Sequence, residues 1–565
     1  MKNDKPLRRS GIKIMAGLIA LLGSLAYIMI LAVINGSLGF ISAMGVTVFG
    51  AIGVAKALGE SVAMSYGLII GLAVGCGALR GILRYFEQYS NHFIAFKLLA
   101  TLRDKIFKAL RRLCPAKLES KKKGSIIAMI TSDIETLEVF YAHTVSPICI
   151  AILVSLAVAI FVGVIGSPYL TLVALAGYLT IGIVLPLISS KLLKKIGVEY
   201  RKAFSLFNAY FMDSIKGIKD IIYHNAGDER KKQVDKRSDE LLSLTYDMKK
   251  NIVNASALTE LAVSLFILIS LIVGIALYIN QLISIGSMII AIVAIFGSFG
   301  PVIAISALPG NLTQTFASGD RVLNLIEEQP AVLPIENAKN MDFNRLEVKD
   351  LNFAYDKNIQ VLKDINLQAQ NGEIVGIVGE SGCGKSTLLK LLLRFWQKDG
   401  GSIAYDGEDI ENINTDSLLS NATMVSQSTY LFDDTVEENL RLAKEDATPE
   451  EMREACKKAS VHDLIMSLPE GYSSRVGLSG DNLSAGEKQR IGLARAFLSG
   501  SKLILLDEPT SNVDSINEGI ILRSLADQRK DKCIILVSHR LSTMAIADRV
   551  YTIKDGIIRL NEKGE

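Results

Sequence analysis

The chain has 565 residues, half of them apolar, and its formal net charge is only +3. Its mean hydropathy of +0.33 is high for a wholly soluble protein. The length predicts more than one domain, and the small net charge argues against a nucleic-acid-binding function that depends on bulk charge. The six cysteines are scattered without a CxxC pair, which indicates reduced thiols rather than a disulfide framework.

The N-terminal sequence MKNDKPLRRSGIK, followed by an apolar run, is similar to an export signal. However, the apolar run that begins at Ile14 is longer than a signal core and has no clear small-residue cleavage site. We therefore interpret this run as a retained first membrane span with the arginine pair as its cytoplasmic flank. A twin-arginine export signal is the weaker alternative.

Six apolar runs are long enough to cross a bilayer, which takes about 20 helical residues. They lie near residues 14–36, 62–82, 146–166, 169–190, 256–279 and 284–307. Residues 37–58 are also apolar, and the sequence leaves open whether they lengthen the first helix or lie at the membrane surface. The first part of the chain is therefore predicted to be a polytopic α-helical membrane domain.

Basic residues predict the orientation of these spans. Residues 80–123 contain twelve Lys or Arg and residues 191–250 contain fourteen, whereas the connections 164–170 and 277–287 contain none. We expect residues 80–145, residues 191–252 and both termini to face the cytoplasm. Both basic segments keep helical periodicity over about 60 residues, which predicts that the spanning helices continue far into the cytosol. Separate solvated helical loops are the alternative.

Residues 329–345 contain two prolines and lose the apolar pattern, so we interpret them as a linker. After them, short β-branched runs alternate with helical stretches; the runs are LEVKDLNFAY, GEIVGIVG, KLILLDEP and KCIILVSH. Such alternation predicts an α/β domain with a largely parallel sheet. The predicted organisation is a membrane domain at 1–328, a linker at 329–345 and a P-loop α/β domain at 346–565.

The segment GEIVGIVGESGCGKSTLLKLLL predicts a strand, a glycine-rich loop and a helix, and it fits the P-loop pattern GxxxxGK[ST]. In such a loop, backbone N–H groups surround the β-phosphate of a nucleotide, the lysine reaches the β/γ oxygens and the serine hydroxyl suits Mg²⁺. For Cys383 we favour a tolerated small residue over an oxidation switch. The predicted nucleotide-binding residues of this loop are Gly379, Ser381, Gly382, Cys383, Gly384, Lys385, Ser386 and Thr387.

Three further apolar strands are followed by polar side chains. LILLDEP ends in Asp507 and Glu508, at the edge of a parallel sheet where ligands bind. Asp507 would act on Mg²⁺ together with Ser386, and Glu508 would polarise the attacking water. His539 ends CIILVSHR; a lone histidine is more often structural, but its place at a strand end favours a contact with the γ-phosphate. Gln427 follows another apolar strand and is placed to contact metal or water.

Two more features concern nucleotide recognition. Tyr355, at the end of LNFAY, is placed to stack on a base, although an aromatic residue there is ordinarily part of the core. Residues 483–490, LSAGEKQR, put a serine, small residues and a carboxylate at a predicted helix start. Free N–H groups and the helix dipole make such a start suitable for an anion. The chain therefore has a second predicted phosphate site.

Taken in order, LNFAY, GESGCGKS, the glutamine segment, LSAGEKQR, LILLDEP, SNVD and SHR resemble the ATP-binding cassette (ABC) transporter superfamily over essentially the whole chain. Six spans followed by one cassette resemble a half-transporter of the type IV exporter architecture. The resemblance implies that Tyr355 stacks on the adenine of ATP, Glu508 is the catalytic carboxylate, His539 is the switch histidine and Asp514 belongs to the loop that joins two sites.

The same resemblance assigns the second phosphate site. The signature motif would contact the γ-phosphate of ATP held by the P-loop of a second cassette, so the chain must dimerise to hydrolyse ATP. Coupling helices near residues 113–117 and 208–219 would transmit cassette closure to the spans. The residues of the signature motif are Leu483, Ser484, Ala485, Gly486 and Glu487.

Two positions depart from the family pattern. The signature reads LSAGE rather than the commoner LSGGQ, so Ala485 adds a methyl group where the partner's phosphate would approach. Leu478 stands where exporters often have a glutamate, which puts the usual contact to the coupling helices in doubt. The catalytic set is otherwise complete.

A narrower resemblance runs through RYFEQYSNHFIAFKLLATLRDKIFKAL and TSDIETLEVFYAHTVSP. These segments are similar to the half-transporters of the cytochrome bd assembly pair, a bacterial heterodimer linked to export of cysteine and glutathione and to haem. The resemblance implies that Arg84 and His92 contact substrate or haem. The alternative for His92 is a structural residue at the cytoplasmic end of the helix that is hydrogen-bonded between helices. His143 and His224 are left unassigned.

Three functions remain open from the sequence. The first is an exporter of a small compound (thiol, amino acid or tetrapyrrole) that uses ATP and Mg²⁺ and works with a different half-subunit as a heterodimer. The second is a lipid or multidrug exporter that works as a homodimer, and the third is a haem-binding assembly or sensing factor with a regulatory ATPase. We expect a multi-pass protein of the cytoplasmic membrane, in contact with the lipid bilayer and its cargo, that binds no nucleic acid.

Overall fold

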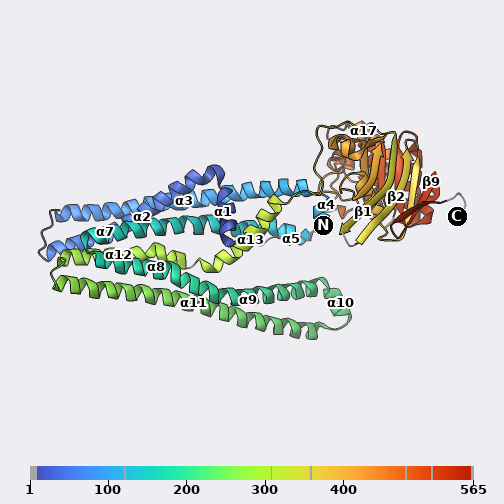
Figure 1. The fold of residues 1–565 in the computed structure, drawn as a ribbon. Coiled ribbons are helices and arrows are strands. Elements are labelled where there is room, and N and C mark those ends of the chain that lie inside the picture. Colours follow the sequence, from blue (N-terminus) through green and yellow to red (C-terminus); the bar gives the residue numbers. More distant parts are fainter. Residues whose placement is uncertain are drawn as a thin grey trace. The chain divides into compact units, whose positions relative to one another are not determined.

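A computed structural model describes residues 9–119, 123–306, 308–356, 359–477, 480–510 and 513–561. The chain divides into two compact units. Residues 9–112 and 123–328 form the first, here called the helical unit, and residues 329–561 together with 113–119 form the second, the α/β unit. Figure 1 shows the elements of both units in chain order by colour.

The helical unit contains six helices that are long and apolar enough to cross a membrane, as predicted. In the described part of the chain they are Gly23–Ala57, Tyr66–Leu113, Gly124–Ile165, Pro168–Lys191, Gly227–Ile279 and Ile285–Ser306. Inside these spans the regular helices are α2 (Ala26–Ala57), α3 (Tyr66–Leu113), α5 (Lys123–Ala128), α6 (Ile134–Phe140), α7 (Ser146–Ile165), α8 (Pro168–Leu179), α9 (Leu185–Lys216), α11 (Gly227–Ile279) and α12 (Ile285–Ser306). Short π-helical segments at Met129–Asp133, Tyr141–Val145 and Thr180–Val184 join some of them.

The predicted bounds of the first span were wrong. The apolar run breaks at Gly23, which adopts φ +48°, so the residues before it form a separate short helix, α1 (Gly11–Ala20). The first span is instead α2, which takes in most of residues 37–58. Helix α1 lies across α13 (Pro309–Glu327) (Figure 1), and the Tyr141 hydroxyl donates a hydrogen bond of 2.7 Å to the carbonyl of Leu18.

Several helices are much longer than a bilayer requires. At 1.5 Å per residue, the 48 residues of α3 extend over about 70 Å and the 53 residues of α11 over about 80 Å, more than twice the hydrocarbon thickness. The spans are therefore continuous with their extensions, as predicted, and the alternative of separate helical loops is wrong. Helices α9 and α11 lie side by side and are joined through the short α10 (Ile218–Tyr223) (Figure 1).

The two expected coupling segments both fall where a long helix turns. Residues 113–117 lie between the end of α3 and α4 (Ala116–Glu119). Residues 208–219 cover the end of α9 and the first residues of α10, so the separate short helix begins later than the sequence suggested. Gly217 interrupts the helical run between α9 and α10.

The α/β unit is built on two sheets. The larger has the order β10-β9-β3-β8-β7-β6, in which β6, β7, β8, β3 and β9 are parallel and β10 is antiparallel to β9. Its strands are β3 (Ile374–Gly379), β6 (Ala422–Val425), β7 (Leu503–Asp507), β8 (Cys533–Ser538), β9 (Arg549–Lys554) and β10 (Ile557–Leu560). All residues of β7 and β8 are buried, which explains their continuous apolar sequences.

The smaller sheet, of order β2-β1-β4-β5, is antiparallel. Its strands are β1 (Arg345–Asp356), β2 (Ile359–Gln370), β4 (Gly400–Tyr405) and β5 (Glu408–Asp409). LEVKDLNFAY therefore does not belong to the parallel sheet, contrary to the sequence pattern. Only two residues separate the end of β1 from the start of β2, and so short a connection permits only antiparallel pairing.

Besides α4, the described residues of the α/β unit contain seven α-helices: α14 (Lys385–Leu392), α15 (Thr415–Asn421), α16 (Val436–Arg441), α17 (Pro449–Lys458), α18 (His462–Ser467), α19 (Ala485–Leu498) and α20 (Ser515–Asp527). Two buried apolar clusters fill the unit, one between the two sheets and α14, and the other between the larger sheet and α16 to α20. Packing on both faces of the larger sheet fixes the carboxyl ends of its strands, where the polar residues lie.

Candidate nucleotide site

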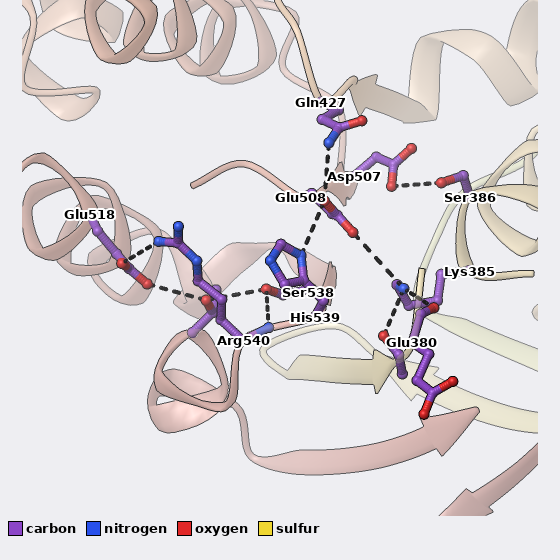
Figure 2. Close-up of polar contacts among 12 residues, drawn as sticks. Glu380, Lys385, Ser386, Gln427, Asp507, Glu508, Glu518, Ser538, His539 and Arg540 are labelled. Carbon is purple, nitrogen blue, oxygen red and sulfur yellow. Dashed lines mark hydrogen bonds and ion pairs between the residues drawn. The ribbon is translucent and has the colours of Figure 1, made fainter. Parts of the chain in front are cut away.

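The structure brings the predicted polar residues to one edge of the larger sheet. The P-loop follows β3, Gln427 follows β6, Asp507 and Glu508 end β7, and His539 follows β8. Since β3, β8, β7 and β6 are parallel neighbours, these carboxyl ends meet at a single edge. Figure 2 shows their side chains converging.

The P-loop wraps around the ammonium group of Lys385. Its Nζ donates hydrogen bonds of 2.8 Å to the carbonyls of Gly379 and Glu380, and the residue is only 5% exposed. Gly384 adopts φ +108°, and a Cβ at Gly379 would come within 2.4 Å of the Ile553 carbonyl oxygen, so both positions require glycine. Ser381 and Gly382 are exposed, and Cys383 is half-buried with its Sγ directed at Gly379.

Glu508 is the centre of a polar network. Its Oε2 accepts a hydrogen bond of 3.1 Å from Gln427 Nε2 and lies 3.2 Å from His539 Nδ1, and its Oε1 lies 3.9 Å from Lys385 Nζ (Figure 2). The backbone of Glu508 has φ +49°, a conformation that costs free energy in residues other than glycine. Such strain, held in place by the hydrogen bond from Glu508 N–H to Val537, is typical of functional positions.

Asp507 and Ser386 form the second polar pair. The Ser386 hydroxyl donates a hydrogen bond of 2.9 Å to Asp507 Oδ1. Burial raises the pKa of the Asp507 carboxyl above its usual range, an effect that the Ser386 bond opposes and the neighbouring Glu508 charge reinforces. A hydroxyl and a carboxylate suit Mg²⁺, which takes one or two carboxylates together with nucleotide oxygens. Gln427 contacts Glu508 instead of this pair.

No cluster of three or more His, Cys, Asp or Glu side chains that would form a complete protein cage for a metal occurs in the described residues. The Asp507–Ser386 pair therefore fits a metal ion that arrives with a nucleotide and completes its coordination from phosphate oxygens and water.

Tyr355 is held against the P-loop helix. Its hydroxyl is 3.0 Å from Thr387 Oγ1, and its ring meets Phe353 and Trp396 edge to face, with centroid distances of 4.9 and 5.0 Å. Trp396, the only tryptophan of the chain, was not singled out from the sequence. It follows α14 at a position that no periodic or motif signal marks.

Helix α19 begins directly after Ser484, as predicted. Ser484 is its N-cap, the Ser484 hydroxyl accepts from Glu487 N–H, and the Glu487 carboxylate accepts from Ser484 N–H at 2.7 Å. This reciprocal capping box fixes the start of the helix. Ala485 is exposed beside it, Leu483 is buried in the core, and Gly486 packs against Val513 and Asn517.

Two residues that follow the signature motif connect it to the rest of the site, and neither was predicted from the sequence to belong to it. The Gln489 side chain accepts from Thr429 Oγ1 at 3.2 Å and donates to the Ser426 carbonyl at 3.3 Å, so it holds the loop that carries Gln427. Arg490 donates to Asn517. The feature that indicates a role for Gln489 and Arg490 is the burial of their polar side chains in α19. This burial depends on how the helix packs, so the sequence does not reveal it.

A groove of about 620 Å³ lies beside the glutamine loop. Its lining combines exposed apolar side chains with the guanidinium of Arg495; the residues include Leu419, Tyr430, Phe432, Leu442 and Arg495. The groove lies within the α/β unit. Leu478 lies outside the described residues.

In the helical unit, Arg84 and His92 are not brought together. Arg84 is exposed and forms an ion pair of 2.6 Å with the buried Glu87, one turn away on α3. The His92 ring lies against Phe96 and against His143, at centroid distances of 6.2 and 6.0 Å. His143, unassigned from the sequence, is thus the neighbour of His92.

Comparison with known proteins agrees with this geometry. Residues 362–511 match the family model described as ABC transporter, and residues 14–302 match the model of the ABC transporter transmembrane region. The chain belongs to the ABC transporter family. Its membrane and ATP-binding domains are fused in one polypeptide.

Relatives extend over nearly the whole transporter. The chain is 46% identical to a probable ABC transporter ATP-binding/permease protein of Haemophilus influenzae, and the match covers 97% of this chain and 100% of the other. It is 32% identical, over 85% of this chain and 83% of the other, to a putative multidrug export ATP-binding/permease protein of Bacillus subtilis. The solved structure of a bacterial Atm1-family ABC exporter with ATP bound has the same fold, with a TM-score of 0.79, 22% identity and coverage of 96% and 95% of the two chains.

These similarities establish the type IV exporter architecture and an ATPase that uses ATP and Mg²⁺ to drive transport. One membrane domain and one cassette in each chain make it a half-transporter, which implies a dimer in the lipid bilayer.

Proposed function

We propose that this ABC transporter exports small compounds with hydrogen-bonding groups, such as thiols, amino acids or tetrapyrroles, across the cytoplasmic membrane. The observation that supports this cargo class is a set of buried polar side chains on two helices that span the membrane. It consists of Glu87 and Asn91 on α3 and Ser146 at the start of α7, whose residues are 3%, 2% and 0% exposed.

These side chains lie near the point where three helices meet. A Cβ at Gly36 of α2 would lie 3.0 Å from Glu87 Cδ and 2.3 Å from Ile150 Cδ1, so α2, α3 and α7 meet there. One turn away, Asn91 follows Glu87 on α3 and Ser146 precedes Ile150 on α7. Among the described residues, Asn91 Oδ1 and Ser146 Oγ have no hydrogen-bond partner. An unpaired polar group buried in a membrane costs free energy of folding. Such groups in membrane-spanning helices therefore indicate a functional role.

The ATPase mechanism follows from the sheet edge. Phosphate oxygens would replace the carbonyls now bonded to Lys385, Mg²⁺ would bind Asp507 and Ser386, and the Glu508 carboxylate would orient and polarise the attacking water. His539 and Gln427 contact Glu508 and lie where the γ-phosphate would arrive. Tyr355 would stack on the adenine, and Ser484 of one subunit would contact the ATP of the other.

For the assembly, we propose a dimer with both cassettes and both termini in the cytoplasm. The heterodimer expected from the sequence rests on the resemblance to the cytochrome bd assembly pair. This chain carries the full set of predicted catalytic and nucleotide-binding residues, including Lys385 and His539, and also the signature serine Ser484. Two identical subunits could therefore also form two complete sites. The multidrug export name of the Bacillus subtilis relative supports the multidrug cargo of the alternative function.

The test is transport by purified protein in proteoliposomes, alone and with a candidate partner half-subunit, against a panel of thiols, amino acids, haem and dyes. We expect uptake of a hydrogen-bonding compound that requires ATP and Glu508. Asn91→Leu should reduce that uptake several-fold and leave basal ATPase unchanged. Ser264→Leu, which changes an exposed serine of α11, is the matched control and should have no effect. Equal transport by the Asn91→Leu protein would remove this set of side chains from the cargo path.

A second candidate function, haem binding, is favoured by one observation. His92 and His143 lie 6.0 Å apart between ring centroids, and imidazole is an ordinary ligand of haem iron. If haem binds, these two side chains would hold it and the haem would supply a redox or sensing group. Titration of the purified protein with haem tests this: a Soret shift that is lost in both His92→Ala and His143→Ala supports it, and no shift eliminates it.

A further inference from the structure

A buried carboxylate close to the catalytic edge belongs to none of the recognised motifs. Glu518 lies in the first turns of α20 and is 9% exposed. It accepts three hydrogen bonds, each of 3.2 Å. Glu518 Oε2 accepts from Arg540 Nη1 (Figure 2). Glu518 Oε1 accepts from Ser542 Oγ and Thr543 Oγ1. All three donors belong to the segment that follows His539.

The hydrogen bonds continue from Thr543 to the residues on both sides of His539. Ser538 Oγ donates to Thr543 Oγ1 at 3.3 Å and accepts from Arg540 N–H at 3.0 Å. Ser538 and Thr543 are 2% and 0% exposed, so these groups cannot exchange their partners for water. The backbone that carries His539 is therefore fixed before and after the histidine.

The His539 side chain itself is only loosely held. It is 45% exposed, and in the described part of the chain its charged or polar neighbour is Glu508, 3.2 Å away. Its position over the nucleotide edge therefore depends on the backbone of residues 538–540, because few side-chain contacts restrict the imidazole.

The first turns of α20 also connect with the signature helix. Asp514 caps α20 by accepting from the N–H groups of Ile516 and Asn517 at 3.0 Å, and Asn517 Nδ2 donates to Asp514 Oδ2 at 2.6 Å. The side-chain oxygen Oδ1 of Asn517 accepts from Arg490 of α19. Glu518 is adjacent to Asn517, so α20 joins the helix that would face the partner's ATP to the loop that carries His539.

We infer that Glu518 is a positioning residue for ATP hydrolysis, which holds His539 in place beside Glu508 through Arg540, Ser542 and Thr543. The inference rests on the role proposed above for His539. Without the carboxylate, the buried Thr543 hydroxyl, the half-buried Arg540 guanidinium and the exposed Ser542 hydroxyl lose this acceptor, and the loop 538–540 is released. A catalytic group displaced by about 1 Å can cost about 100-fold in rate.

The experiment measures ATPase and ATP binding of the full chain in lipid. Glu518→Ala should lower kcat about 10- to 100-fold and change the affinity for ATP by less than about twofold, because the P-loop and Tyr355 are untouched. Glu518→Gln should resemble the alanine variant, since its amide nitrogen would face donors. Glu518→Asp keeps the charge and should restore part of the rate.

The matched control is Glu373→Ala. Glu373 is another buried glutamate of this unit, 8% exposed and paired with Arg549, but it lies just before β3, at the opposite end of the strand from the P-loop. Its loss should lower the thermal midpoint about as much as the loss of Glu518 and leave kcat within about twofold of the wild type. An equal loss of kcat in both variants would show a general effect of stability and overturn the inference.

A double-mutant cycle separates positioning from other effects. If Glu518 acts through His539, the Glu518→Ala/His539→Ala protein should have the kcat of His539→Ala alone. The inference is overturned if the two losses of kcat multiply in the double variant. It is also overturned if Glu518→Ala has a normal kcat while His539→Ala is impaired. In both cases the role proposed for His539 stands. A normal kcat in His539→Ala would instead overturn the role of the histidine, and the inference with it.

Discussion

Glu508 is held at a position where its charge matters more than its shape. Its carboxylate is contacted by Gln427, His539 and Lys385, and its backbone has positive φ. A glutamine there keeps the size and the backbone but removes the negative charge that would polarise water. The residue therefore allows binding and chemistry to be separated.

We expect Glu508→Gln to lower ATP turnover by at least about 100-fold and to retain ATP binding, since loss of a general base typically costs 10²–10⁴-fold. Phosphate release and nucleotide binding are the measurements. Glu380→Gln is the control, because Glu380 contacts Lys385 through its backbone carbonyl and its carboxylate is exposed. Normal turnover in Glu508→Gln would exclude Glu508 as the catalytic group.

Glu487 places a negative charge at the start of the signature helix. Its carboxylate accepts a hydrogen bond from the N–H of Ser484, a donor that would otherwise be available to a phosphate. In the commoner motif the corresponding residue is a neutral glutamine. The departure thus stabilises the helix and opposes an incoming anion.

We expect Glu487→Gln to lower the KM for ATP several-fold, because repulsion between the carboxylate and the partner's γ-phosphate is removed. The KM of ATPase in proteoliposomes is the measurement. Glu451→Gln provides the control, since Thr448 and Glu451 form the same capping box at α17. A KM that is unchanged or higher in Glu487→Gln would show that the charge does not oppose nucleotide binding.

At the scale of elements, the end of the α9–α11 pair is stiffened by an aromatic clamp. The Tyr210 ring of α9 lies between two guanidinium groups of α11, with Arg230 at 3.7 Å and Arg237 at 4.2 Å from its centroid. Arg230 also donates to Ser214 Oγ at 2.8 Å and to the Tyr210 carbonyl at 3.3 Å. A pair of long helices that transmits movement must resist bending and splaying.

Tyr210→Ala should loosen this clamp, because each cation–π contact contributes about 0.5–1 kcal/mol at such partly exposed sites. We expect trypsin to cleave after Arg230 and Arg237 several-fold faster than in the wild type. Tyr223→Ala, which changes a tyrosine of α10 that is 78% exposed, should have no effect on that rate. Equal cleavage of the wild type and Tyr210→Ala would show that the stacking does not hold the helices.

At the scale of the whole molecule, the proposed site is divided between two chains. Lys385 and Ser484 each belong to a different ATP site if the cassettes face each other in a dimer. Lys385→Ala and Ser484→Ala should therefore be inactive separately.

Mixed in equal amounts before reconstitution, these two variants should regain activity. Half of the dimers would combine one chain of each kind, which leaves one site with both changes and one intact site, or about a quarter of the wild-type sites. ATPase of the mixture is the measurement, and its recovery also shows that both proteins fold. Activity of either variant alone would contradict shared sites, and failure to complement would indicate a different partner chain.

The sequence by itself determined the two-part organisation, the six spans and the edge at which Lys385, Asp507, Glu508 and His539 meet. These features rest on local patterns: apolar length, a glycine-rich loop between strand and helix, and buried strands that end in polar residues. Neighbouring residues carry such signals, so no long-range contact is needed to read them.

Only the tertiary structure decided that α1 is separate from the first span, that β1 belongs to an antiparallel sheet, and that Trp396, Gln489 and Glu518 lie next to motif residues. It also placed His143 beside His92 and buried the polar side chains of Glu87, Asn91 and Ser146. Each of these depends on contacts between residues far apart in the chain, and a side chain of ordinary type gives no sign of such a contact until the backbone has folded.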